Sequence, residues 1–172
     1  LRDGHRQKYS LSAAGGSEGL RYYFGGSFEN NKGVLLLDEE QRASIRGNFD
    51  ISPAENLELS WNTSYTSTDI TNTPAGNNAH GITLNAFRRN RNYLSTNNPD
   101  SIDQFLEYDI STKIDRMITG VTARYQPTEA LMQRVTFGYD LANSEMRNER
   151  GFGFRGFPRG IISNGKWTNT TF

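Results

Sequence analysis

Hydrophobic and polar residues alternate one by one along several stretches of this chain. In residues 42–51, for example, Ile45 and Phe49 belong to one side, while Arg42 and Arg46 belong to the other. A repeat of two residues indicates a β-strand, because successive side chains of a strand point to opposite faces. We therefore predict an all-β fold with strands at 7–16, 20–29, 42–51, 57–66, 116–125 and 133–142.

The two sides of the predicted strands differ sharply in chemistry. The apolar sides contain no charged residue and hold many of the aromatic residues, including Phe24, Phe49, Trp61, Tyr65, Phe137 and Tyr139. The opposite sides carry Arg42, Arg46, Asp50, Glu58, Arg124, Arg134 and Asp140. If the sheet crosses a bilayer, the first set is expected to face lipid and the second set is expected to face a polar lumen or a plug inside it.

The predicted connections alternate between short and long. Residues 17–19, 52–56 and about 126–130 form short connections that are rich in turn-forming residues. Residues 30–41, residues 68–115 and the segment 143–170 are much longer. Short turns on one rim and long loops on the other are typical of an antiparallel up-and-down outer-membrane β-barrel, in which the long loops are extracellular.

A soluble antiparallel sheet with one buried face shows the same alternation, so periodicity alone leaves both interpretations open. Strand length, loop asymmetry and the charge density of the polar sides favour the membrane. Six strands cannot close a barrel, since the smallest outer-membrane barrels use eight. An open edge in lipid leaves backbone groups unpaired at several kcal/mol each. We therefore expect the 172 residues to be part of a larger barrel.

Composition narrows the functional classes. The chain has 19 Lys and Arg and 19 Asp and Glu, which argues against a nucleic-acid partner. It has no cysteine and 2 histidines, and no catalytic constellation or metal-ligand spacing stands out, so we expect neither an enzyme nor a bound cofactor or metal. No run of 18 apolar residues could form a membrane-spanning helix. No signal peptide or plug domain is recognisable, and we expect a fragment of a longer protein.

The order of the motifs resembles the early barrel region of SusC/RagA-type TonB-dependent outer-membrane receptors. The similar stretches cover about residues 7–66 and 114–142, and they include the sequences at 9–16, 20–28, 31–35, 42–50, 57–60, 125–127 and 138–140. The resemblance implies a 22-stranded barrel with an N-terminal plug, and active uptake of oligosaccharides or peptides energised by TonB. It also implies a SusD-type surface lipoprotein as a partner, besides outer-membrane lipid and a location in the bacterial outer membrane.

The longest loop contains a second candidate site. Arg88, Arg89, Arg91 and Tyr93 could stack on sugars or bind carboxylates as an extracellular ligand site. The same residues could equally hold the loop against acidic neighbours or face lipopolysaccharide. The sequence at 151–156 spells G-x-G-x-x-G, but the polar residues before it and Pro158 after it exclude a nucleotide-binding turn.

Three functional hypotheses remain open. The first is part of a transporter that imports a nutrient, in which the loops at 68–115 and 143–170 gate or bind. The second is an outer-membrane barrel with a structural or adhesive surface role. The third is a soluble β-sheet binding module.

Overall fold

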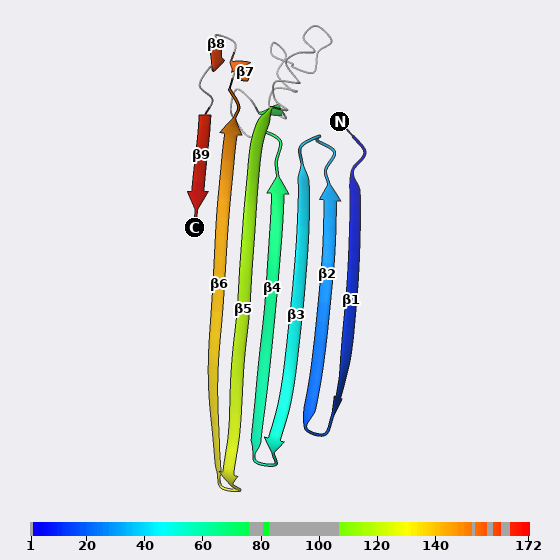
Figure 1. The fold of residues 1–172 in the computed structure, drawn as a ribbon, viewed down its shortest axis with the longest axis vertical. Helices are drawn as coiled ribbons and strands as arrows, with labels where there is room; N and C mark the ends of the chain where they lie inside the picture. Colours follow the sequence, from blue (N-terminus) through cyan, green and yellow to red (C-terminus); the bar gives the residue numbers. More distant parts are fainter. Residues whose placement is uncertain (1, 76–80, 83–106, 153, 158–159, 163–165) are drawn as a thin grey trace.

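The computed structural model describes residues 2–75, 81–82, 107–152, 154–157, 160–162 and 166–172. In these residues the chain forms β-strands joined by turns and loops (Figure 1). The strands are β1 (His5–Ser17), β2 (Leu20–Lys32), β3 (Glu39–Ala54), β4 (Leu57–Thr71), β5 (Tyr108–Thr128), β6 (Leu131–Arg150), β7 (Phe154–Phe157), β8 (Gly160–Ile162) and β9 (Lys166–Thr171).

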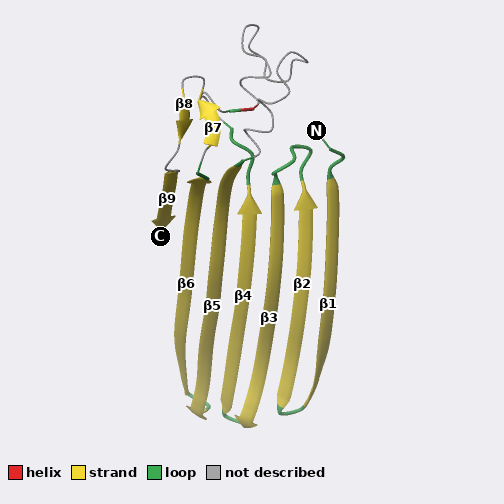
Figure 2. Cartoon of the chain, turned by 45° about the horizontal axis from the view of Figure 1, so that its top comes forward, coloured by secondary structure: helices red, strands yellow, loops and turns green. Residues whose placement is uncertain are grey.

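One antiparallel sheet contains seven of these strands, in the order β1-β2-β3-β4-β5-β6-β9. The first six follow one another in sequence, so each pairs with the next along the chain, as in an up-and-down meander. The short strands β7 and β8 pair with each other in a separate hairpin. Figure 2 shows the seven strands side by side in a single open layer, with β1 at one edge and β9 at the other.

All six predicted strands lie inside β1 to β6, and the turn asymmetry is confirmed. The connections β1–β2, β3–β4 and β5–β6 are tight and lie together at one end of the sheet (Figure 1). The strand ends that the longer connections join lie at the opposite end. Register shifts between Ile51 and Ala54 and between Tyr125 and Thr128 place one extra residue in β3 and in β5 beside two of the tight turns.

The predicted loop boundaries need correction. β4 continues to Thr71 and β5 already begins at Tyr108, so the connection is shorter than the predicted 68–115. β6 continues to Arg150, and β9 pairs with it, so the predicted loop 143–170 is largely strand and hairpin in its described part. The alternation of apolar and polar residues stops before these strands end. The backbone hydrogen bonds between strands need no apolar side chain, so they continue past the last alternating residues.

The described sheet has no protein core of its own. Tyr108 is the one buried large apolar residue among the described residues. Phe24 is 50% exposed, Trp61 is 44% exposed and Phe137 is 68% exposed, so these aromatic residues do not converge on a shared interior. No helix in the described part of the chain is long and apolar enough to cross a bilayer.

Candidate functional site

The strand register places the predicted lipid-facing residues on one face of the sheet. Phe49 pairs with Tyr22 on β2 and with Trp61 on β4. Trp61 in turn pairs with Val121 on β5, which pairs with Phe137 on β6. Directly paired residues share a face, so one row of large apolar residues crosses five strands. We call this side the apolar face, and its members also include Tyr9, Leu11, Phe24, Phe28, Tyr65 and Tyr139.

Aromatic rings pack against one another across the centre of the apolar face. The ring centroids of Phe24 and Phe49 lie 5.1 Å apart, edge to face at 82°. Those of Phe49 and Trp61 lie 5.0 Å apart and are stacked at 18°. Aromatic pairs in these arrangements add about 0.5–1.5 kcal/mol beyond the area that they bury. The sheet thus carries a continuous aromatic surface rather than isolated apolar residues.

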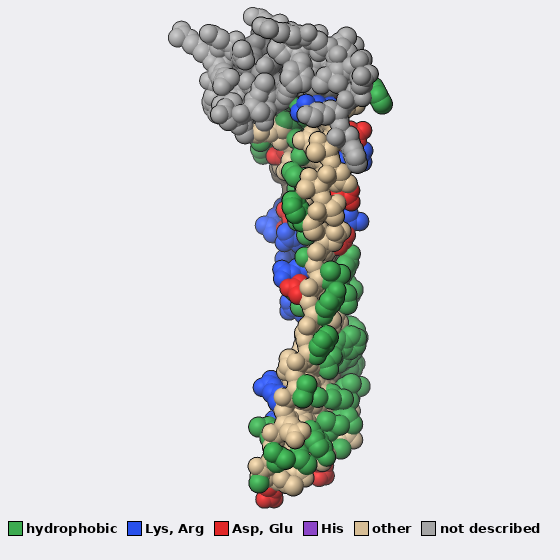
Figure 3. Space-filling view, turned by 90° about the vertical axis from the view of Figure 1, so that its left-hand side faces the viewer, with side chains coloured by type: hydrophobic (Ala, Val, Ile, Leu, Met, Phe, Trp, Pro, Cys, Tyr) green, Lys and Arg blue, Asp and Glu red, His purple; other side chains and the backbone are tan. Residues whose placement is uncertain are grey.

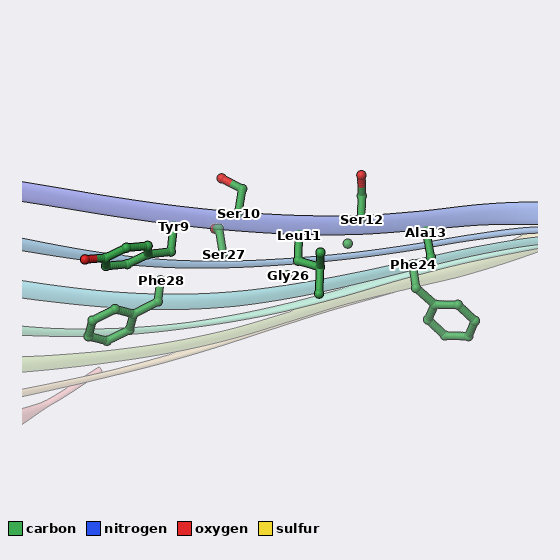
Figure 4. A pocket seen from close by; sticks show the side chains of 10 residues that line it. Tyr9, Ser10, Leu11, Ser12, Ala13, Phe24, Gly26, Ser27 and Phe28 are labelled. Atoms are coloured by element: carbon green, nitrogen blue, oxygen red, sulfur yellow. The ribbon is translucent and has the colours of Figure 1, made fainter.

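A shallow apolar groove of about 500 Å³ lies on this face between β1 and β2. It opens above Gly26, and the side chains of Tyr9, Leu11, Phe24 and Phe28 lie along it (Figure 4). The same view shows Ser10 and Ser12 pointing away from the groove, to the other side of β1. The groove offers a mostly apolar surface along β1 and β2.

The apolar face ends at a defined level. Tyr65 donates a hydrogen bond to Asp115 at 2.8 Å, and Ser67 donates one to the same carboxylate oxygen at 2.7 Å. Beyond this level the same face carries charged residues, namely Asp69, Asp109, Lys113, Glu145, Arg147 and Glu149. The predicted strand at 116–125 begins one residue after Asp115, so the sequence prediction did not include this carboxylate.

Figure 3 views the sheet along its edge and shows the resulting band. Apolar side chains cover the right-hand side in the lower part, Lys and Arg gather on the left, and charged residues replace the apolar ones higher on the right. Along β4 the band runs from Leu57 to Tyr65. At roughly 3.4 Å per residue this is about 27 Å of strand. That length is close to the apolar band of about 25 Å that outer-membrane barrels present to lipid.

The seven residues predicted to face a lumen or plug lie together on the opposite side, which we call the polar face. They are Arg42, Arg46, Asp50, Glu58, Arg124, Arg134 and Asp140. The register adds further charged residues to this face, namely Arg6, Lys8, Arg21, Glu29, Glu40 and Arg116. Basic residues therefore outnumber acidic ones on the polar face of β1 to β6.

Most carboxylates of the polar face have a partner. Arg116 donates to Asp140 through Nε at 3.0 Å and through a second guanidinium nitrogen. Glu58 lies 3.3 Å from Arg124. Asp50 accepts a hydrogen bond from Ser60 at 2.8 Å. Glu29 lies between two basic side chains, at 2.6 Å from Arg6 and 3.8 Å from Lys8.

The rim at the long-loop end is held by backbone and side-chain contacts. Arg2 donates hydrogen bonds of 2.9 Å to the carbonyl oxygens of Gly33 and Asp38. The carboxylate of Asp38 accepts a 2.6 Å hydrogen bond from the amide of Thr73. The guanidinium of Arg150 lies 4.7 Å from the ring centre of Tyr108. Burial raises the pKa of the Tyr108 phenol, and the nearby Arg150 partly opposes this rise.

The predicted loop site cannot be placed. Arg88, Arg89, Arg91 and Tyr93 lie outside the described residues. In the part of the chain that the structure describes, no group of three or more His, Cys, Asp or Glu side chains could hold a metal ion.

Comparisons with known proteins bear on the fold. No model of a known protein family matches the chain, and no curated protein sequence matches it. Among solved structures, the RagAB peptide importer in the "closed-closed" state has a similar fold, with a TM-score of 0.65. The match covers 95% of this chain at 16% sequence identity, and it covers 21% of the chain in that structure. This chain thus spans about a fifth of the length of the importer chain, and at this identity the similarity shows the fold alone.

Proposed function

We propose that this chain is part of an outer-membrane β-barrel receptor that actively imports a nutrient such as a peptide or an oligosaccharide. The observation that carries the proposal is the two-faced single sheet. One face bears a continuous apolar band, the other bears charges, and the tight turns all lie at one end.

Lipid is the covering that best suits the apolar face. Val135 and Phe137 are both 68% exposed, and Leu11 is 82% exposed. Contiguous apolar patches of more than a few hundred Å² are rare on soluble monomers. The groove beside Phe24 suits an acyl chain in shape and chemistry. A soluble module would need a second protein layer over this band, and the described residues supply none.

A larger closed barrel explains the two free edges of the sheet. β1 and β9 each have one neighbour within the described chain, and an unpaired edge in lipid is costly. Barrels of the 22-stranded type carry a plug in their lumen. The sequence resemblance to SusC/RagA receptors and the fold similarity to a much longer peptide importer support such a barrel. On the same resemblance, TonB and a SusD-type lipoprotein are its proposed partners.

Transport is favoured over an adhesive role by the polar face. An adhesin needs specific chemistry at its extracellular loops, whereas here the charged residues extend along the strands to Arg134, near the tight turns. Such a wall suits a lumen through which a polar solute moves. The proposed receptor is not an enzyme and requires no cofactor of its own.

The test uses the full-length protein in its own bacterium. We expect it in the outer-membrane fraction, extractable with detergent only. We also expect deletion of its gene to abolish uptake of one class of labelled peptide or oligosaccharide, and a protonophore to abolish uptake in the parent strain. Recovery in the soluble fraction would contradict the proposal in favour of a soluble module. An outer-membrane protein whose deletion changes surface attachment and no uptake would favour the adhesive role.

Thr119 provides a smaller test of the lipid environment. The indole nitrogen of Trp61 donates a 2.9 Å hydrogen bond to the hydroxyl of Thr119 on the apolar face. In hydrocarbon, no water replaces a lost acceptor. We expect Thr119→Val to lower the free energy of unfolding in lipid vesicles by about 0.5–1 kcal/mol, the usual range for such bonds in membranes. In a Trp61→Phe background the same change should cost nothing, and an equal cost there would contradict a hydrogen bond between these two side chains.

A further inference from the structure

The polar face contains a hollow of about 550 Å³ near the centre of the sheet. Gly120 on β5 pairs directly with Gly138 on β6, so two neighbouring positions on this face lack side chains. The same row continues through Asn62 on β4 and Asn48 on β3. Arg46, Ser64, Ile118 and Asp140 border the hollow on the adjacent row.

The two glycines are not required by the packing of the sheet. A Cβ atom added to Gly138 would meet nothing within 4 Å. One added to Gly120 would meet the carbonyl oxygen of Phe137 at an ordinary 3.6 Å. Glycine within a strand weakens it and often marks a place where a ligand or another backbone approaches closely. The glycines therefore keep space open above the sheet rather than relieve a clash within it.

The side chains around the hollow have hydrogen-bonding capacity to spare. Arg46, Asn48, Asn62 and Ser64 make no side-chain hydrogen bond or ion pair within the part of the chain that the structure describes. Asp140 is the one carboxylate that lines the hollow, and Arg116 already binds both of its oxygens. The positive charge of Arg46 is therefore not neutralised locally, and the hollow attracts anions.

We propose that this hollow is a binding subsite for a carboxylate group of the imported solute. The guanidinium of Arg46 would bind the carboxylate with paired N–H donors, which is the geometry that arginine favours. The amides of Asn48 and Asn62 and the hydroxyl of Ser64 would supply further hydrogen bonds to it or to adjacent polar groups. The inference rests on the proposed transport function and narrows its substrate class. An acidic peptide and a uronic-acid oligosaccharide both present this group.

Thiol chemistry at Ser64 tests the subsite, because Ser64 lines the hollow, pairs directly with Arg46 across β3 and β4, and the chain has no cysteine. We would make Ser64→Cys in the full-length receptor without other cysteines, purify it, and measure its reaction with a sulfonate-bearing and a trimethylammonium-bearing methanethiosulfonate. Relative to a free thiol, we expect the anionic reagent to be favoured by about fivefold. Adding Arg46→Gln should remove this preference, and adding Arg46→Lys should retain it.

Protection experiments then distinguish the two sources of the carboxylate. Slower labelling with a glutamate-rich peptide, and not with oligogalacturonate, would support the subsite and assign it to peptides. The reverse result would support it and assign it to acidic sugars. Equal rates for the two reagents, an unreactive thiol, or protection by neither compound would overturn the inference. Uptake by the unmodified receptor is measured separately, so failure here leaves the transport proposal intact.

Discussion

Replacing Val121 with Arg should strongly destabilise the folded protein in lipid. Val121 lies on the apolar face between Trp61 and Phe137, midway along the band in β5. An Arg at the bilayer midplane of an outer-membrane barrel costs about 2–4 kcal/mol. We expect a loss of this size in the free energy of unfolding, measured by urea titration of the full-length protein in lipid vesicles.

The matched control is Thr122→Arg, one residue along the same strand. Thr122 lies on the polar face, where its hydroxyl is 3.1 Å from that of Thr136. An added guanidinium there remains in a polar environment, so we expect a loss well below 1 kcal/mol. Equal losses of unfolding free energy for the two variants would show that both faces lie in the same kind of environment. A larger loss for Thr122→Arg would show that the polar face, and not the apolar face, contacts lipid.

Gly16→Ala should have the second-largest effect, through a direct clash at the β1–β2 turn. A Cβ atom added to Gly16 would collide with the carbonyl oxygen of Leu20 and would lie 2.8 Å from the Cα of Arg21. Both are backbone atoms, so the turn must move to relieve the overlap. Forced overpacking of this kind typically costs about 1–3 kcal/mol. The same urea titration measures the loss, together with a lower yield of folded protein.

Gly138→Ala is the control for the glycine change, because the added methyl group meets nothing within 4 Å. Both substitutions replace a strand glycine by alanine, so they share the effect on the unfolded chain. We expect Gly138→Ala to be neutral or slightly stabilising. A Gly16→Ala protein as stable as Gly138→Ala would refute the close approach at the turn.

The alternation of side chains was enough to predict the strands and their faces, but not where the strands end. The alternation of apolar and polar residues marks only the part of a strand that has one face in an apolar environment. β5 begins at Tyr108, and the residues between it and Met117 are polar or charged on the apolar side, with Lys113 and Asp115 as examples. Strand β9 lies mostly within the predicted loop 143–170 for the same reason, because its described sequence around Asn169 is polar on both faces.

The sequence predicted a charged face for the sheet, but not which residues of that face lie next to one another. The polar sides of the predicted strands already contained Arg46 and Asp140. Register between strands decides which residues meet, and it places Asn48 beside Asn62 and Gly120 beside Gly138. No local pattern in the sequence fixes that register, because it depends on turn geometry and on packing across several strands. The hollow and its arginine therefore become visible only in the assembled sheet.

The most direct test of the two-faced sheet is a nitroxide scan of β4, one labelled position at a time from Leu59 to Tyr65, in the reconstituted full-length protein. Leu59, Trp61, Thr63 and Tyr65 belong to the apolar face, and Ser60, Asn62 and Ser64 belong to the polar face. We expect oxygen to relax the labels of the first set and a water-soluble nickel chelate to relax those of the second, with a period of two. Labels on the apolar face that are shielded from oxygen, or that respond to the nickel chelate as strongly as the polar ones, would contradict a lipid-covered surface.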